Sequence, residues 1–537
     1  MCIRDSGATF PLLVKVCSTG SGQLGHKIAR VYALNTAGGA VGSLAAGFVL
    51  LPWVGVQRSI DVVSATNVLV GLSVLVASGA PRRAAIAASA TLVGALAIAL
   101  VTVPSDAIAA IYSERYAPQN HELLYLHESI SGTTAVIREV GRDGVGDRRY
   151  LIIDGRGEVS TDYFSMRAFR LLALLPAFYA AHASRALVVT FGSGIVAGSI
   201  GALSELRHAD CVEICDEAFQ AARYFSEENH DVLDNPKMHF VVDDGREYLL
   251  TTREEYDIIS ADATHPASGD SWVLYTREFY ELCARRLGDG GVMSQWVPTH
   301  GVRESDFKTI LETFHAVFPY VSLYYSGGYK AAGHVVLLGS RSPLRIDVRR
   351  AERLFADERV RTDLADVNVL SLPDLFNCFL FDQGAIDAFA AGAPVNTDDR
   401  PIVAFSASET PRVPRSWLAS VARFRQSVFA QLSGMDDQAA PGIEQGLRTS
   451  FEATTYAVEG QILEAEEYAE RLSLDLDRPD ERTRQGLERS RSLLEQVVAK
   501  YAAALRTNPK EAHTRYLMMH AAAEMQALDR FAARPAP

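Results

Sequence analysis

The stretch from Val31 to Val103 is almost free of charged residues. It divides into three apolar segments, each near the roughly twenty residues that a helix needs to cross a bilayer: Val31–Val54, Ser59–Gly79 and Ala84–Val103. The first segment is rich in glycine and alanine, which allow helices to approach closely in lipid. A buried helical hairpin in a soluble domain is the alternative, but three consecutive long apolar runs are rare there. The sequence therefore predicts a partial transmembrane domain of about three helices over residues 1–104.

The charges around these segments give conflicting information about orientation. Lys27 and Arg30 precede the first segment, and Arg82 with Arg83 separate the second from the third. The positive-inside rule would make both places cytoplasmic and put the chain after Val103 outside. Because Arg58 lies in the opposite loop, the sidedness stays open.

The rest of the chain has the composition of a soluble α/β protein. A length of 537 residues predicts two or three domains. The formal net charge of −13 argues against a nucleic-acid partner, which would need a basic face. The six cysteines contain no CxxC pair and predict buried thiols, with neither a disulfide framework nor a zinc site.

Strand-like runs alternate with helical patterns after residue 105. A small β-rich region comes first, with Thr133–Val140 and Arg149–Asp154. The alternation that follows is typical of a parallel doubly wound sheet. The expected strands are Arg185–Phe191, Asp210–Ile214, Met238–Val242, Tyr256–Ala261 and Gly291–Val297, with a terminal hairpin of Val321–Tyr325 and His334–Leu338.

Polar residues follow four successive strands of this pattern, where ligands bind in open α/β sheets. Gly192-Ser193-Gly194 follows the first strand and lets the backbone approach a ligand. Glu213 ends the second strand, 21 positions after Gly192, a spacing that suits ribose hydroxyls. Asp243-Asp244-Gly245 and Asp262 follow the third and fourth. A redox Rossmann domain would need no acidic residue at those two ends, so an adenine-and-sulfonium site is favoured.

Several motifs resemble the spermidine synthase family over about 290 residues, from Leu123 to Phe405, and its membrane-fused bacterial branch in particular. They are Leu151–Gly155, Gly192–Gly194, Glu213, Asp244-Gly245, Tyr256–Asp262, Tyr275–Tyr280 and Asn396–Pro401. The resemblance implies a Rossmann-like, AdoMet-dependent transferase domain with a small N-terminal β region, preceded by transmembrane helices and followed by a helical tail.

The resemblance also implies a site. Gly192, Gly194, Glu213, Asp243, Asp244 and Gly245 would bind decarboxylated S-adenosylmethionine, or S-adenosylmethionine, as a co-substrate without a metal. Asp262 would accept the proton of the attacking amine. The partners implied are a small-molecule amine, the membrane and a second copy in a homodimer. The protein would be a multi-pass protein of the bacterial inner membrane, with its catalytic domain in the cytoplasm, where the co-substrate is made.

The amine half of the expected site departs from the family pattern. The glycine-loop carboxylate is replaced by Ile195, and His265 stands where a second catalytic-loop aspartate is usual. Glu158 replaces a glutamine, and the family's Tyr-His pair is not evident around Met166 and Arg167. His265 and Glu158 are therefore further catalytic candidates; the alternative for each is an ordinary polar residue at the surface. Putrescine is doubtful as the acceptor.

Both ends of the chain carry further signals. Gly7–Pro11, Tyr32–Thr36 and Gly47–Pro52 resemble motifs that follow earlier spans in the membrane-fused branch, so a fragment of a longer protein is expected. From Trp417 onward the pattern is helical, and Tyr501–Leu505 with Asn508-Pro509 resembles the end of a tetratricopeptide-type repeat. The expected domains are 1–104, 105–180 (linker and small β region), 181–410 (Rossmann domain) and 411–537 (helical tail).

Three functions remain open from the sequence. The first is a membrane-anchored aminopropyltransferase of polyamine biosynthesis. The second is another AdoMet-dependent transferase, such as a methyltransferase. The third is a non-catalytic nucleotide-sensing module, which the rewritten amine half supports.

Overall fold

The computed structural model describes residues 24–77, 81–103, 107–116, 120–129, 132–141, 146–266, 271–299, 301–329, 332–406, 417–435, 440–474 and 481–532. It forms two compact units. One comprises the described residues up to Val140 together with Ile153–Arg156, and the other comprises Gly141–Ile152 and the described residues from Gly157 onward. Cys2, Cys17 and the motif Gly7–Pro11 lie outside the described residues.

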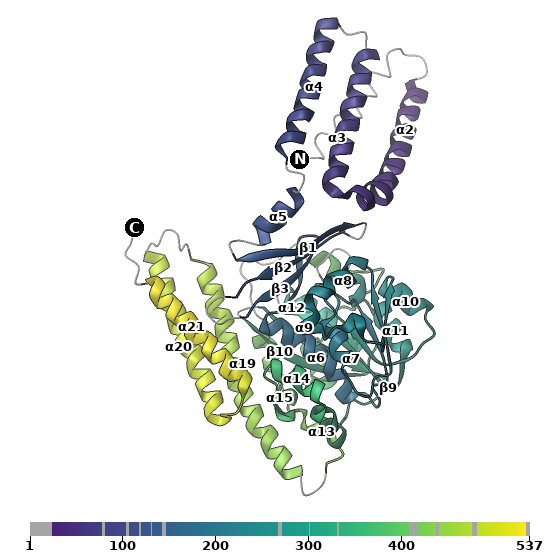
Figure 1. The fold of residues 1–537 in the computed structure, drawn as a ribbon. Coiled ribbons are helices and arrows are strands. Elements are labelled where there is room, and N and C mark those ends of the chain that lie inside the picture. The colour runs from purple at the N-terminus through teal and green to yellow at the C-terminus, as the bar shows by residue number, and fades with distance from the viewer. Residues whose placement is uncertain are drawn as a thin grey trace. The chain divides into compact units, whose positions relative to one another are not determined.

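The first unit consists mainly of apolar helices, drawn in purple and blue in Figure 1. They are α2 (Leu24–Ala45), the π-helix η1 (Ala46–Leu50), α3 (Leu51–Ala77), α4 (Arg82–Thr102) and α5 (Ala107–Tyr116), followed by the antiparallel strands β1 (His121–Ser129) and β2 (Gly132–Glu139). By length and composition, two helical stretches could cross a membrane: Ile28–Val76, of 49 residues, and Arg82–Thr102.

The long stretch contains a break that separates two of the predicted segments. Gly55 has φ +77°, a conformation that an α-helix does not contain. The carboxylate of Glu128 accepts a hydrogen bond from the freed Val56 N–H at 3.0 Å. The apolar side chains of these helices are uncovered, with Trp53 80% and Val76 85% exposed. Such surfaces suit lipid, since water would disfavour them.

The second unit is built on an eight-stranded sheet of order β13-β10-β11-β9-β8-β5-β6-β7. Its parallel strands are β5 (Arg185–Val189), β6 (His208–Glu213), β7 (Met238–Val242), β8 (Tyr256–Ala261) and β9 (Leu287–Pro298). An antiparallel extension contains β10 (Tyr320–Tyr329), β11 (Ala332–Ser340) and β13 (Phe379–Asp382). The predicted parallel sheet and terminal hairpin are confirmed. Short strands β3 (Arg148–Ile153) and β4 (Arg156–Ser160) precede the sheet in the chain.

Helices cover both faces of this sheet because alternate strand residues point to opposite sides. On one face, Ser294 donates to the Leu172 carbonyl of α6 (Tyr163–Tyr179) at 3.0 Å. On the other, Met293 joins a buried cluster with α11 (Arg277–Arg286), α12 (Glu304–His315) and α16 (Gln383–Phe389). The other helices are α7 (Ile195–Gly201), α8 (Asp216–Ala221), α9 (Ser226–Asn229), α10 (Gly245–Thr251), α13 (Val348–Ala356), α14 (Glu358–Asp366), α15 (Leu372–Phe376), α17 (Ile402–Ser406) and α18 (Leu418–Ala422).

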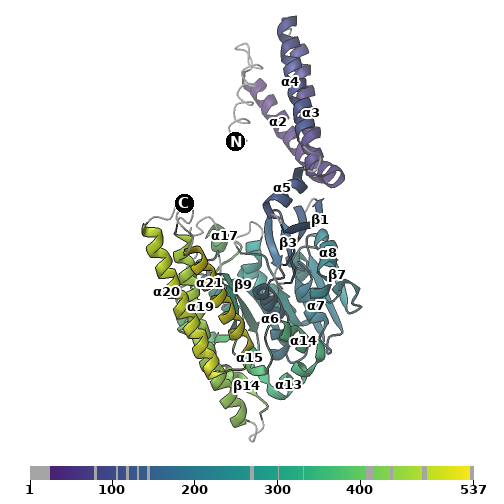
Figure 2. The same ribbon diagram turned by 60° about the vertical axis from the view of Figure 1, so that its left-hand side comes forward.

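The C-terminal region is helical, as predicted, and consists mainly of α19 (Ala440–Leu472), α20 (Glu481–Thr507) and α21 (Ala512–Ala532), drawn in green to yellow (Figure 2). Tyr501 of α20 is fully buried against Gly460 of α19. The segment before these helices packs against the part of the unit that contains the sheet. Trp417 stacks on Phe307 at 3.8 Å, and β14 (Leu432–Ser433) pairs with β12 (Ile346–Asp347).

Candidate active site

The strand order places a switch point between β5 and β8. From β5 the chain proceeds outward through β6 and β7, then returns to form β8 on the other side. Ligands of open α/β sheets bind at such a point, beyond the carboxyl ends of the strands. Asp262 immediately follows β8, and its N–H donates to the Val189 carbonyl at the end of β5 at 3.1 Å. The sheet therefore brings the predicted strand-end residues to one edge.

The loop after β5 has a conformation that requires its glycines. Gly192 has φ +55° and Gly194 has φ +79°. A Cβ at Gly194 would lie 2.7 Å from the Phe191 ring, so any larger residue would displace it. The loop leads directly into α7, whose first residue, Ile195, is 1% exposed. Ile195 is thus part of the apolar core.

Glu213 holds this loop from the end of β6. One oxygen accepts from the N–H groups of Phe191 at 2.9 Å and Gly192 at 3.2 Å, and the other accepts from Cys215 N–H at 2.9 Å. Burial raises the pKa of Glu213, while these backbone N–H groups act in the opposite direction. The carboxylate therefore sits against the glycine loop, where a ribose is expected.

The residues after β7 form a tight turn into α10. Asp243 accepts the N–H of Asp244 at 2.8 Å, and Asp244 caps α10 by accepting from Arg246 N–H at 2.7 Å and Glu247 N–H at 3.2 Å. A Cβ at Gly245 would lie 2.6 Å from a methyl group of Val189. Glycine at 245 therefore lets this turn approach the end of β5.

Asp262 has the most perturbed carboxyl group of the predicted site. Burial, together with the negative charges of Glu158 and Glu213, raises its pKa to about 7. Glu158 is half-buried on β4. The charges of Glu158 and Glu213 thus act on Asp262, although the three residues lie on different strands or strand ends. A carboxyl group titrating near neutral pH can accept a proton efficiently.

Tyr275 also lies in this group, and no strand-end rule would have found it. It is fully buried, and its hydroxyl donates to the carbonyls of Thr264 and Trp296, each at 3.2 Å. Burial raises its pKa well above the usual value, and the charge of Asp262 adds to this. Tyr275 therefore stays a neutral donor that fixes the chain just after Asp262.

His265 is half-buried on the same segment. A Cβ at Gly301, which has φ +65°, would lie 2.8 Å from His265 Nε2, so this histidine contacts the backbone after β9. Arg167 is buried elsewhere: it donates to the Ser326 carbonyl at 2.7 Å, to the Val367 carbonyl and to Cys378 Sγ at 3.2 Å. It fixes α6 to neighbouring segments.

The Asn396–Pro401 motif contacts two segments of the candidate site. Asn396 donates to the Tyr275 carbonyl at 3.0 Å. Asp398 forms a bidentate pair with Arg246, at 2.9 and 2.6 Å, just after the Asp243–Gly245 turn. The motif thereby joins the segment containing Tyr275 to the start of α10, a contact between residues 152 positions apart.

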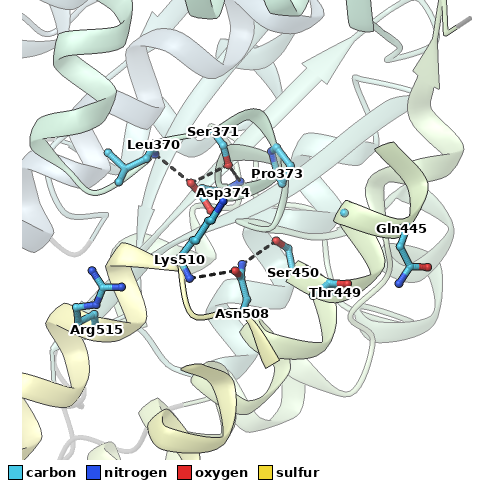
Figure 3. Close-up of a pocket in the computed structure, with 11 residues that line it drawn as sticks. Leu370, Ser371, Pro373, Asp374, Gln445, Thr449, Ser450, Asn508, Lys510 and Arg515 are labelled. Atoms are coloured by element: carbon cyan, nitrogen blue, oxygen red, sulfur yellow. Dashed lines mark hydrogen bonds between the residues drawn. The ribbon is translucent and has the colours of Figure 1, made fainter. Parts of the chain in front are cut away.

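A cavity of about 620 Å³ lies elsewhere in this unit (Figure 3). It is lined by α15 and the loop before it, by α19, and by α21 and the turn that precedes α21, including Asp374, Ser450, Asn508 and Lys510. Asn508 donates to Ser450 at 3.1 Å in its wall. It contains none of the residues predicted for the site and is unrelated to the carboxylates around Asp262.

The parallel sheet, with the glycine loop at its switch point and acidic residues at its strand ends, defines a Rossmann-like α/β domain. Residues 167–338 match the family model of the spermine/spermidine synthase domain. This segment of the chain is therefore similar to the spermine/spermidine synthase domain.

The chain is also similar to several known proteins. The chain is 28% identical over 299 residues to a polyamine aminopropyltransferase of Corynebacterium efficiens, covering 53% of this chain and 55% of that protein. It is 26% identical over 333 residues to that of Mycobacterium tuberculosis, covering 58% and 61%. The solved spermidine synthase from Thermotoga maritima aligns with a TM-score of 0.36 at 18% identity, over 43% of this chain and 78% of that one. The alignments thus span between half and two thirds of the length of the Corynebacterium and Mycobacterium relatives.

Proposed function

We propose that this chain is an aminopropyltransferase that joins an amine to the aminopropyl group of decarboxylated S-adenosylmethionine. The observation that carries the proposal is Asp262, a carboxyl group with a pKa of about 7 at the switch point of the sheet. The attacking nitrogen would form a bond to the sulfonium-bound carbon as the carbon–sulfur bond breaks. Methylthioadenosine would leave, and Asp262 would take the proton released by the nitrogen.

The surroundings of Asp262 favour a cationic acceptor. The Asp262 carboxyl group is subject to the negative charges of two others, Glu158 and Glu213. An ammonium group bound there would relieve their repulsion, whereas a neutral acceptor would leave it in place. Glu158 would bind the distal ammonium of the acceptor, and His265 would contact it from the Asp262 segment. Gly192, Gly194, Glu213 and the Asp243–Gly245 turn would hold the nucleoside of the co-substrate.

We further propose that the apolar helices anchor the enzyme in a membrane. The uncovered apolar faces of α3 and α4 support this. Because the co-substrate is made in the cytosol, the catalytic unit would face the cytoplasm of a bacterial cell.

The test is product analysis by mass spectrometry with the full-length chain in detergent. Decarboxylated S-adenosylmethionine and S-adenosylmethionine are supplied separately, each with a panel of diamines and polyamines. Methylthioadenosine with an aminopropylated amine is the expected result. A methylated product from S-adenosylmethionine alone would reassign the chain as a methyltransferase. Nucleotide binding without turnover on any acceptor would contradict the proposal and favour a sensing module.

The role of Asp262 is tested by Asp262→Asn. The variant should lose about 100-fold or more in turnover, while its affinity for the nucleotide co-substrate stays near that of the wild type. Asp289→Asn is the matched control, since Asp289 is an exposed aspartate on a turn of β9 and should leave turnover unchanged. Equal turnover of Asp262→Asn and the wild type would refute Asp262 as the proton acceptor.

A further inference from the structure

A cluster of two histidines and an aspartate lies at the opposite edge of the sheet from the candidate active site. His208 and Asp210 belong to β6, and His239 belongs to β7. Asp210 and His239 are directly paired across the two parallel strands. Because side chains two residues apart point to the same face of a strand, His208 joins them there. The three stand at the amino ends of strands whose carboxyl ends carry Glu213 and Asp243.

The three side chains converge on one point. Asp210 Oδ1 lies 3.0 Å from His208 Nε2 and 2.9 Å from His239 Nδ1. One ligand atom from each residue lies within 4.8 Å of the other two. Ligands of a metal ion bound at about 2.0–2.2 Å lie about 3–3.5 Å apart, so small side-chain rotations would complete the geometry.

We propose that His208, Asp210 and His239 bind a divalent transition-metal ion of the zinc type. Two imidazoles and one carboxylate are a ligand set that such ions prefer, and together they carry one negative charge. Three protein ligands leave a further coordination position for water.

The surroundings of the cluster suit a metal site. Tyr256 is fully buried and donates its hydroxyl to the second oxygen of Asp210 at 2.7 Å, which fixes the carboxylate with Oδ1 facing the histidines. The side chain of Asp210 is 4% exposed, whereas those of His208 and His239 are 42% and 62% exposed, so an ion can enter from solvent. The nearby cation Lys237 is held by the Leu203 carbonyl at 3.0 Å.

Such an ion would clamp β7, the last strand of the sheet, to β6. Cysteine spacing could not reveal this site, because the site contains no cysteine. The ordinary alternative is a hydrogen-bonded His-Asp-His cluster that satisfies a buried carboxylate and binds no ion.

The chain is purified in detergent without a polyhistidine tag and is treated with a chelator. The test is titration of this full-length chain with Co²⁺ and Zn²⁺. Calorimetry should give one strong site per chain, and Co²⁺ should produce the absorption bands of a low-coordinate site. His208→Gln and His239→Gln should each weaken binding at least about tenfold, and Tyr256→Phe about tenfold. His182→Gln, an exposed histidine outside the cluster, should leave binding unchanged.

A second measurement uses the wild type alone, so its result does not depend on whether the variants fold. Bound Zn²⁺ should protect His208 and His239, but not His182, from acylation by diethylpyrocarbonate, as mapped by mass spectrometry. The absence of a strong site in the wild type, or equal affinity in the wild type and the His208→Gln/His239→Gln double variant, would overturn the proposal. Equal acylation of the three histidines with and without Zn²⁺ would do the same.

Discussion

Charge repulsion among carboxylates sets the properties of Asp262. Since the charge of Glu158 raises the pKa of Asp262, its removal should lower that pKa. We expect Glu158→Gln to move the acidic limb of the kcat/KM profile from near pH 7 to lower pH. The same change should raise KM for the amine, because one carboxylate that would attract the ammonium is lost. The measurement is kcat/KM across pH 5.5 to 9 with a saturating nucleotide.

Glu247→Gln is the control for this experiment, because Glu247 is an exposed glutamate in the first turn of α10. It removes the same charge and should leave the limb in place. An unchanged acidic limb in Glu158→Gln would show that Glu158 does not act on the proton acceptor.

The bidentate pair of Arg246 and Asp398 allows a second prediction. Arg246 holds the pKa of Asp398 below its usual range, so the pair's contribution to stability is present above that range and is lost as the pH falls. Because the Asp398 side chain is 38% exposed, we expect Arg246→Lys to lower the free energy of unfolding by only about 1 kcal/mol. KM for the nucleotide should rise, since α10 begins at the Asp243–Gly245 turn.

Denaturant unfolding and steady-state kinetics measure the two effects. Arg277→Lys is the matched control: its guanidinium lies 3.5 and 3.6 Å from two glutamates on the same helix and is 47% exposed. If the two lysine variants behaved alike, the pair with Asp398 would have no special role. Combining Arg246→Lys with Asp398→Asn should cost less than the sum of the single changes.

Individual positions differ in how far the sequence could identify them. Glu213 and Asp262 were predictable because a polar residue directly after an apolar, β-branched run marks the end of a buried strand. The Arg246–Asp398 pair and the His208–Asp210–His239 cluster were not, because each joins segments whose pairing only the folded sheet determines. Tyr275 begins the Tyr275–Tyr280 motif, but its contact with the Thr264 carbonyl just after Asp262 depends on the return of the chain after β8.

The strands also differ in how well the sequence predicts them. The five parallel strands were predicted within a few residues, since each contains a short apolar run. The predicted end of β5 was two residues late, because Thr190, with φ +64°, and Phe191 already belong to the loop. The strands β1, β4, β12, β13 and β14 were missed. No residue of β1 and only one residue of β4 is fully buried, and the other three strands have two to four residues, too few for a pattern.

The contact of α21 with α6 is the clearest pH-sensitive feature between elements. His513 is buried, its Nδ1 lies 2.7 Å from the Tyr163 hydroxyl, and Tyr516 stacks on the Tyr163 ring at 3.9 Å. Burial lowers the pKa of His513 well below its usual value, and the charge of Arg167 adds to this. Its folded pKa is therefore below its unfolded pKa. The contribution of neutral His513 is present above about pH 6.5 and is lost as the pH falls.

We expect α21 to lose hydrogen-exchange protection as the pH falls below about 6, before the sheet does. His513→Asn, which cannot be protonated in this range, should reduce that pH dependence. His520→Asn is the control on the same helix, since His520 is only half-buried. Exchange measured by mass spectrometry at several pH values, corrected for the intrinsic rate, tests this. Equal pH dependence in both variants would contradict it.

On the scale of the whole molecule, the chain combines a domain that is similar to spermidine synthases with long apolar helices. The sheet unit buries its apolar residues in continuous clusters, whereas α3 and α4 leave large apolar side chains uncovered. Water would disfavour such a surface, so it needs lipid or another apolar partner. We expect the full-length chain to fractionate with membranes, to resist extraction at alkaline pH and to require detergent for solubility.

A variant of α4 distinguishes lipid from a soluble apolar partner. Val93 and Ile98 are 49% and 65% exposed on this helix. Replacing both with arginine should cost about 2.5–3.5 kcal/mol per residue at the centre of a membrane helix and should release α4 from the bilayer. Val93→Leu/Ile98→Leu, which keeps the apolar surface, should stay in the membrane fraction. The catalytic unit contains neither position, so turnover in detergent should be the same for both variants. If the full-length chain stayed soluble without detergent, the apolar faces would have to pack against protein, and the proposed anchoring would be wrong.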